Sequence, residues 1–514
     1  MKQYRTISLY FLFFMLSVGI SAQSEMPHVC GFHPDEAHIE RLEKNVATSQ
    51  QFQFQRSNEI NYVPVKFHLI AQTNGTGRVT DTDIFNQMCI LNENFAPYGF
   101  QFFLKDNSLN YIDNSAAYND ASAATPILRL NRDNRALNIY FANNITSGSQ
   151  GGGTTLGYYD PQEDWVAMRN DQISSVFTLS HEIGHFFSLM HTFFGWESDP
   201  YEEEKHGNPV TQFWAPNQFP QTQVELMDGS NCSVAADRIC DTPPDYNFGS
   251  RWMNCAPFTL EVLDRNNDLV KPMQNNYMSY FFGCSDYLFT PMQSDAMKVD
   301  FSSFKRNHLR NGFEQPDTAA ITGTPVPLSP MTNDTSTYYD EVTLVWDGAE
   351  NATFYYLEVS GLPFFGPNII EATLVTGNEF TLTDLQPHKD YYWRVKPLNG
   401  TNYCTSRSSN FKFTTSDLST GLKEFPESEF NISIAPNPTR IGSTPSLIIQ
   451  NEMRVQNLEL SVYNVNGQLL HTENITPSQG YSKINLNKQI TQSGMYYITV
   501  TSSKYRTVQP LIVQ

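Results

Sequence analysis

The residues best suited to chemistry lie in residues 181–191, which read HEIGHFFSLMH and contain three histidines and one glutamate. Residues four apart on a helix lie one turn above each other, so His181 and His185 would present two imidazoles to one point. His191, six residues further on, could supply a third ligand if the helix ends between them. Three histidines leave one open position on a tetrahedral zinc ion, and Glu182 stands where a carboxylate could take a proton from water held there. The spacing predicts a catalytic zinc site with Glu182 as general base.

Two other interpretations compete with this one. The pattern HExxH arises by chance in long chains, and a histidine on an apolar helix face is more often a packed core residue than a ligand. The apolar residues at helical spacing in 173–180 favour the zinc site, because an active-site helix is buried against a sheet. A rival third ligand is Glu204, but Gly195 and Pro200 interrupt the helix that would have to carry it. We therefore expect His191 to complete the site.

The longer segment HEIGHFFSLMHTF resembles the extended zinc signature of the metzincin metalloproteases, and its closing His-Thr-Phe resembles their pappalysin or cytophagalysin branch. The segment departs from the family pattern at Ser188, where a glycine usually lets the chain leave the helix with positive φ. A residue with a side chain pays on the order of 1 kcal/mol in that conformation. We therefore expect a strained turn ahead of His191.

Residues 275–280 resemble the methionine turn that lies beneath the metzincin zinc site. By this resemblance Met278 is a soft, apolar floor under the imidazoles and not a ligand. Tyr280 matches a tyrosine that in related enzymes reaches the metal or the developing oxyanion. Three aromatic residues follow that either line an apolar substrate pocket or belong to the core: Phe281, Phe282 and Tyr287.

The resemblance covers residues 60 to 312 and implies an α/β (α+β) metzincin catalytic domain, which we place at 58–315. The residues themselves agree with this class, because 63–70, 100–104 and 137–141 have the composition and alternation of strands. Residues 80–95 have the pattern of an amphipathic helix, with Cys89 as a small buried apolar residue. The glycine-rich residues 151–158 are either an edge strand that binds extended substrate by strand addition or an ordinary flexible loop.

Two all-β sandwich domains are expected to follow. Trp346 and the Tyr-x-Trp-Arg-Val run at 391–395 resemble a fibronectin type III sandwich, placed at 324–416. A polar linker at 417–429 leads to residues 430–514, which resemble the C-terminal sorting domain of the type IX secretion system of Bacteroidetes. This resemblance implies that the secretion machinery handles the chain and that the protein reaches the extracellular space or the outer-membrane surface.

The N-terminus has the features of an exported zymogen. Residues 1–22 combine a basic start, an apolar run and a small-residue exit, as in a secretory signal peptide. Residues 23–57 are polar and have the character of a pro-segment. Within it, Cys30 either supplies a thiolate to the open zinc position or forms a disulfide with Cys89 or Cys404.

Four further cysteines lie within about fifty residues of each other: Cys232, Cys240, Cys255 and Cys284. In an exported chain they predict two disulfides, for which three pairings exist. The Cys-Asp-Thr-Pro-Pro run at 240–244 also resembles the pappalysin branch, whose members often hold structural calcium here. Asp241 is either a calcium ligand or the capping residue of a turn.

Composition bounds the remaining possibilities. The chain of 514 residues is long enough for several domains, and its 40% hydrophobic content is ample for folded cores. A net charge of -20 argues against a nucleic-acid partner, because phosphate binding needs clustered Lys and Arg. Beyond the signal peptide, no apolar run approaches the length of a membrane span.

Together these features predict a secreted zinc endopeptidase that acts on protein or peptide substrates. A function of a different class is an adhesin or surface-binding protein whose metal site is structural or inactive. The presence of Glu182 favours the enzyme, because a structural metal site has no need of a general base at that position.

Overall fold

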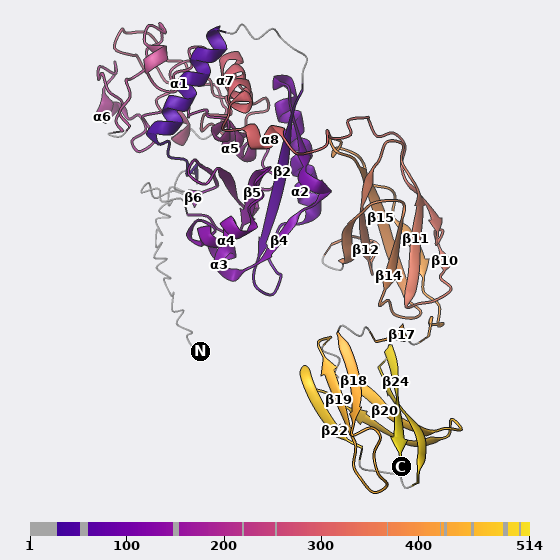
Figure 1. Ribbon diagram of the computed structural model, residues 1–514. Helices are drawn as coiled ribbons and strands as arrows, with labels where there is room; N and C mark the ends of the chain where they lie inside the picture. Colours follow the sequence, from indigo (N-terminus) through magenta and orange to yellow (C-terminus); the bar gives the residue numbers. More distant parts are fainter. Residues whose placement is uncertain are drawn as a thin grey trace, which may run out of the picture.

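The computed structural model describes the following parts of the chain: residues 28–51, 60–146, 154–217, 220–251, 254–366, 369–421, 423–425, 429–453, 457–486, 492–502 and 505–514. The expected signal peptide at 1–22 lies outside the described residues, as do parts of the expected pro-segment and the glycines at 151–153. Figure 1 shows three regions that follow one another along the chain, first one of mixed helices and strands and then two built of strands.

A six-stranded sheet forms the centre of the first region, with the strand order β3-β2-β5-β8-β7 and with β4 as a further partner of β2. The pairs are parallel except for β7 with β8, which is antiparallel. Parallel strands are covered on both faces, which explains why β5 is buried at every position. The strands include those expected from the sequence, and their bounds are β2 (Asn61–Ala71), β3 (Phe100–Leu104), β4 (Asn110–Asp113), β5 (Leu137–Ala142), β7 (Gly157–Asp160) and β8 (Trp165–Arg169).

Helices cover both faces of this sheet. Val65 and Phe67 of β2 point into the larger core, whereas Ile70 points into a smaller one on the opposite face, as the alternation of a strand requires. The larger core receives α2 (Asp81–Phe95), α5 (Thr178–Phe186) and α7 (Pro291–Ser302), and the smaller one receives α3 (Ser115–Asn119) and α4 (Thr125–Asn131).

The N-terminal segment is an integral part of this region. Its helix α1 (Glu36–Gln51) lies against α7 (Figure 1) and contributes Ile39, Leu42 and Val46 to the larger core. The short strand β1 (His28–Val29) pairs in parallel with β6 (Thr154–Thr155), which directly precedes β7. The expected pro-segment is therefore packed onto the sheet and onto the helices that follow it.

The chain between α5 and α7 is largely irregular and is tied by two disulfides. Cys232 pairs with Cys240, and Cys255 pairs with Cys284, which settles the pairing that the sequence left open. This stretch contains α6 (Glu203–His206) and leads to α7, after which α8 (Asn307–Arg310) closes the region.

The second region is a sandwich of two sheets, ordered β10-β16-β15-β12-β13 and β14-β11-β9, that enclose Trp346 and Trp393. Its strands are β9 (Val326–Ser329), β10 (Asp334–Thr335), β11 (Glu341–Asp347), β12 (Phe354–Ser360), β13 (Ile369–Val375), β14 (Glu379–Thr383), β15 (Asp390–Leu398) and β16 (Phe411–Thr414).

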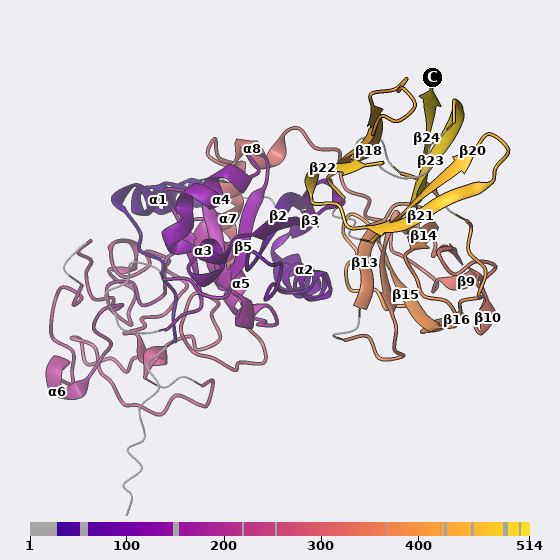
Figure 2. The same cartoon turned by 90° about the horizontal axis from the view of Figure 1, so that it is seen from below.

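This sandwich is fastened to the first region, beside α2 and β3 (Figure 2). Cys89 of α2 forms a disulfide with Cys404, so the prediction that Cys89 is a buried apolar residue was wrong. The buried Tyr403 accepts a hydrogen bond through its hydroxyl from the backbone N–H of Leu104, at 3.0 Å. The two regions therefore share a covalent link and a packed boundary.

The third region is a second sandwich, with sheets ordered β17-β24-β23-β20-β21 and β18-β19-β22 around an apolar core of its own. Its strands are β17 (Lys423–Glu424), β18 (Phe430–Ala435), β19 (Ser446–Asn451), β20 (Leu458–Asn464), β21 (Leu469–Ile475), β22 (Gly480–Asn485), β23 (Gly494–Thr501) and β24 (Tyr505–Val513). Across the described parts of all three regions, no helix has the length and apolar character needed to cross a membrane.

Candidate active site

The helix that carries the first two histidines ends in the strained turn expected from the sequence. Residue Ser188 has φ 78°, and its N–H bonds to the carbonyl of His185 at 2.9 Å. The N–H of Leu189 bonds to the carbonyl of Gly184 at 3.0 Å, and these two bonds form a Schellman motif. The motif satisfies the last carbonyls of α5 and lets the chain turn back, which brings His191 beside the helix.

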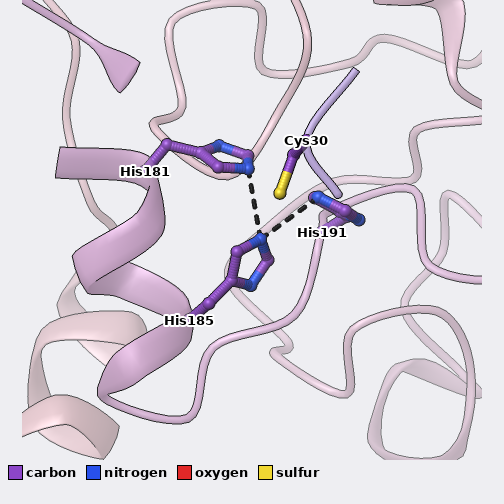
Figure 3. A group of neighbouring side chains, drawn as sticks. All are labelled: Cys30, His181, His185 and His191. Carbon is purple, nitrogen blue, oxygen red and sulfur yellow. Dashed lines mark hydrogen bonds between the residues drawn. The ribbon is translucent and has the colours of Figure 1, made fainter. Parts of the chain in front are cut away.

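The structure brings the three histidines together (Figure 3). The Nε2 atom of His185 lies 3.1 Å from Nε2 of His181 and 3.2 Å from Nε2 of His191. A tetrahedral zinc ion with Zn–N bonds of 2.0–2.1 Å separates two ligand nitrogens by about 3.3 Å. The spacing of the three nitrogens therefore fits a zinc ion.

The other ring nitrogens show that the Nε2 atoms of His181 and His185 are acceptors. The Nδ1 atom of His181 lies 2.6 Å from the carbonyl of Tyr277, and Nδ1 of His185 lies 2.8 Å from the carbonyl of Leu189. A carbonyl can only accept, so each Nδ1 carries the proton and each Nε2 presents a lone pair. The close Nε2 contacts bring these lone pairs together, an arrangement that a cation would stabilise.

Burial keeps the imidazoles neutral. Removal from water lowers the pKa of His181 and of His191 to about 3, and lowers the pKa of His185 well below its ordinary value. Neutral imidazole is the form that binds metal. The three rings are therefore in the required state without a change in protonation.

Cys30 is the fourth member of the cluster. Its Sγ and the histidine nitrogens lie within 4.8 Å of one another, and its thiol is free. A disulfide from Cys30 to Cys89 or Cys404 is excluded, because those two residues pair with each other. The Cys30 thiol donates to Oε2 of Glu182 at 3.4 Å.

Glu182 is enclosed beside the histidines. Its side chain is fully buried, and its Oε1 atom has no hydrogen-bond partner. Burial raises the pKa of Glu182 to about 8. A Cβ atom at Gly157 would lie 2.9 Å from Cγ of Glu182, so only glycine at this point of β7 leaves room for the carboxylate. In the sequence, Gly157 stood out only as one of the glycines in residues 151–158, and nothing pointed to its contact with Glu182.

Tyr280 and Met278 both lie close to the histidines, and the ring centroid of Tyr280 is 5.0 Å from that of His191. The Tyr280 hydroxyl accepts from the N–H of Cys30 at 3.1 Å and donates to the Cys30 carbonyl at 3.3 Å. Met278 is fully buried, and its Sδ occupies the space that a side chain at Gly184 would need. Met278 therefore packs directly against α5 beneath the histidines.

A small cavity adjoins the cluster. Its lining comes from the N-terminal segment, from the residue before β7, from α5 and the residue before it, and from the methionine turn and the residues after it. These residues are Cys30, Leu156, Phe177, Thr178, His181, Glu182, Tyr280 and Phe282. Of the aromatic residues that follow the turn, Phe282 lines this cavity, whereas Phe281 is fully buried in the core. The cavity is mainly apolar apart from the catalytic candidates.

The N-terminal segment covers the site. The N–H of Gly31 bonds to the carbonyl of Gly157 at 3.0 Å, and the ring of Phe32 stacks on His185 with centroids 3.9 Å apart. Further along, Asn45 of α1 donates to Oγ of Ser188 at 2.9 Å. The segment therefore contacts the edge of the sheet, one of the histidines and the turn that positions another.

Two other candidate ligands from the sequence lie apart from the cluster. Glu204 is exposed on α6 and belongs to no metal-binding group among the described residues. Asp241 accepts from the N–H of Met292 at 2.9 Å and so caps the first turn of α7. In contrast, Glu197 went unnoticed in the sequence, yet its Oε1 lies 3.2 Å from Nδ1 of His191.

Comparison with known proteins gives relatives for two parts of the chain. Residues 433–514 match the family model of the secretion system C-terminal sorting domain. An extracellular metalloprotease of Sordaria macrospora is 30% identical over 320 residues, which are 57% of this chain and 94% of the relative. One of Colletotrichum graminicola is 28% identical over 301 residues, which are 54% of this chain and 90% of the relative.

Among solved structures, a segment of two fibronectin type III domains from chicken tenascin matches 39% of this chain and 99% of its own length. Its sequence identity is 12% and its TM-score is 0.21.

Proposed function

Because this chain belongs to the family of extracellular metalloproteases, we propose that it is a zinc endopeptidase of the pappalysin-like metzincin type that hydrolyses peptide bonds in proteins. The observation that carries this proposal is the convergence of three histidine Nε2 atoms beside the buried carboxylate of Glu182. The metalloprotease relatives favour the enzyme over the surface-binding alternative. The sorting domain shows that the protein is exported by a Bacteroidetes-type bacterium, and the relatives are extracellular as well.

His181, His185 and His191 would hold the zinc ion. When bound, zinc would supply Lewis-acid chemistry that acidifies a water molecule and polarises the scissile carbonyl. The contribution of the three residues is a set of neutral rings, fixed by hydrogen bonds at Nδ1, that requires no rearrangement on binding.

Glu182 is the proposed general base. Its carboxylate would take a proton from the attacking water and pass it to the leaving amine. Burial favours this shuttle, because the raised pKa makes the ionised carboxylate a stronger proton acceptor. The Tyr280 hydroxyl would donate a hydrogen bond to the developing oxyanion.

The same atoms support a zymogen. Cys30 would occupy the fourth ligand position through its sulfur. Its backbone N–H donates a hydrogen bond to the Tyr280 hydroxyl, and its carbonyl accepts one from the same hydroxyl. The N-terminal segment pairs with β6 through β1, and its Gly31 N–H bonds to the Gly157 carbonyl of the edge strand β7 at 3.0 Å. It would therefore occupy backbone positions on which an extended substrate could otherwise add as a strand. Activation would then require the N-terminal segment to leave the site.

The structural calcium ion that the resemblance implies for the irregular stretch before α7 remains a proposal. Glu225, Asp237 and Asp245 are buried there, but no carboxylate of this stretch belongs to a metal-binding group among the described residues. Bound calcium should raise the melting temperature of the metal-stripped chain, and an unchanged melting temperature would count against a calcium site.

A comparison of the wild type with Glu182→Gln tests the enzyme. Both proteins are treated with trace trypsin to remove the N-terminal segment, the trypsin is inhibited, and the proteins are then assayed for zinc content and casein digestion. We expect both to retain zinc, and the variant to lose activity by about 10²- to 10⁴-fold, the usual contribution of a general base. Casein digestion that survives in the variant, or that continues in the wild type after zinc is chelated, would refute the proposal.

A further inference from the structure

One of the three histidines has a carboxylate as its outer partner. Oε1 of Glu197 lies 3.2 Å from Nδ1 of His191, whereas the corresponding partners of His181 and His185 are backbone carbonyls. We propose that Glu197 is a positioning residue that fixes the ring of His191 and thereby sets the affinity of the site for zinc. This inference rests on the proposed function, because it presupposes that the three histidines bind zinc.

The local chain is folded so that Glu197 meets the ring. Two successive turns, with bonds from Phe194 N–H to the His191 carbonyl at 3.0 Å and from Trp196 N–H to the Phe193 carbonyl at 2.9 Å, bring Glu197 back toward His191. The ring of Phe193 stacks on His191 with centroids 4.6 Å apart. The imidazole is thus held on its face by Phe193 and at its Nδ1 edge by Glu197.

Gly195 is required for this turn. Its φ is 101°, a region that other residues rarely adopt. A Cβ atom at this position would lie 2.5 Å from Cγ2 of Thr222 and 2.6 Å from Cβ of Ala215. The N–H of Gly195 in turn donates to Oε2 of Glu197 at 2.8 Å, so the glycine that permits the turn also orients the carboxylate.

A second donor completes the orientation. The Asn217 amide donates to Oε2 of Glu197 at 2.6 Å, which leaves Oε1 directed at His191. With the proton of His191 on Nδ1, its Nε2 lone pair faces the other two histidines. A carboxylate partner makes a histidine a stronger metal ligand than a neutral partner does, and loss of such a partner usually weakens metal binding about 10- to 100-fold.

The test compares Glu197→Gln with Asp199→Asn in the full chain. Asp199→Asn removes a carboxylate from the same loop that pairs with Lys205 and not with His191, so it controls for the loss of a negative charge near the site. Zinc affinity is measured by competition with a chromophoric chelator, melting temperature by thermal unfolding, and ligand geometry from the visible spectrum of the cobalt-substituted protein. We expect Glu197→Gln to weaken zinc binding about 10- to 100-fold and to shift the cobalt bands. Asp199→Asn should leave both metal readouts near the wild type.

Wild-type zinc affinity in Glu197→Gln, or an equal loss of affinity in Asp199→Asn, would overturn the inference while leaving the zinc site intact. Failure of the wild type to bind zinc would instead overturn the proposed function, and this inference with it. If Glu197→Gln does not fold, Glu197→Asp keeps the charge but withdraws it from Nδ1. Zinc binding by Glu197→Asp as tight as that of the wild type would contradict the inference equally.

Discussion

The sulfur of Cys30 lies 3.4 Å from Oε2 of Glu182 and within the same cluster as the three histidine Nε2 atoms. One side chain therefore reaches both the open side of the proposed zinc site and the proposed general base. Its backbone N–H and carbonyl meanwhile bond to the hydroxyl of Tyr280. The N-terminal segment therefore contacts Glu182 and Tyr280 directly and lies beside all three histidines.

Removal of the Cys30 thiol should therefore raise the activity of the intact chain. In Cys30→Ala the fourth ligand position opens, and Glu182 loses its contact with sulfur. We expect casein digestion by the uncleaved protein to increase on the order of tenfold or more, since tenfold corresponds to the loss of only about 1.4 kcal/mol of inhibitory contact. Intact protein is verified by gel before and after the assay. If uncleaved Cys30→Ala digests casein no faster than the uncleaved wild type, the sulfur plays no part in the inhibition.

Helix α1 should determine how readily the segment leaves. Asn45 donates to Oγ of Ser188 at 2.9 Å and to Oδ1 of the buried Asp300 at 3.0 Å, so Asn45→Ala leaves two buried acceptors short of a partner. Such a loss costs about 1–3 kcal/mol. We expect activation by trace trypsin to be about tenfold faster than in the wild type, as followed by casein digestion.

Glu40→Ala is the matched control for this experiment, because Glu40 lies on the same helix but is exposed. It should activate at the wild-type rate. Equal acceleration in both variants would mean that helix propensity, and not the contact with Ser188 and Asp300, controls activation.

The positive φ of Ser188 predicts a difference between two substitutions. Ser188→Ala and Ser188→Gly both remove the hydroxyl that accepts from Asn45, but only glycine relieves the left-handed conformation at φ 78°. Ser188→Gly should therefore be the more stable by about 1 kcal/mol, or about 2–4 °C in melting temperature for a domain of this size. Equal melting temperatures would show that the turn is not strained.

The sequence was most informative where chemistry imposes local spacing. His181 and His185 are brought together by one helical turn, and the turn at Ser188 followed from the family pattern and the cost of a left-handed residue. Contacts between distant parts of the chain were not predictable in this way. The disulfide of Cys89 with Cys404 joins residues 315 apart in two different regions, and nothing in the local sequence links them. The contact of Glu197 with His191 depends on the fold of the turns between them, which the sequence pattern did not reveal.

A buried histidine in the central sheet should make stability depend on pH. His68 of β2 donates through Nε2 to the Asn138 side chain at 2.9 Å, and Nδ1 accepts from the Asn110 amide at 2.9 Å. Burial lowers the pKa of His68 from 6.5 to about 4 in the folded protein. Between pH 6.5 and pH 4 the unfolded chain binds more protons at this histidine than the folded protein does. The contribution of the neutral His68 to the free energy of unfolding is therefore full above pH 6.5 and is lost as pH falls toward 4.

The expected contribution of His68 is a loss of about 2 kcal/mol between pH 7 and pH 5. Because other groups titrate in the same range, the measurement is the difference between the wild type and His68→Gln in the pH dependence of the melting temperature. The wild type should lose more stability than the variant on acidification. Parallel curves would mean that His68 has an ordinary pKa in the folded state.

The link between α2 and the first sandwich should be the most stabilising of the three disulfides. In the chain-entropy account, the restriction of the unfolded state grows with the length of the closed loop. Cys89 and Cys404 are 315 residues apart, whereas Cys232 and Cys240 are 8 apart, which favours the former by about 3 kcal/mol. The interface supports the same expectation, because Arg407 of the sandwich donates to Oγ1 of Thr82 at 2.7 Å and Tyr356 packs edge-on against Phe85.

The test pairs the double variants Cys89→Ser/Cys404→Ser and Cys232→Ser/Cys240→Ser. We expect the first double variant to lower the melting temperature of the first region by the larger amount. It should also let the first and second regions unfold in separate transitions in calorimetry, since only packing would then couple them. Equal losses in the two variants, with a single transition retained in both, would show that the packed boundary around Tyr403 holds the regions together without the covalent link.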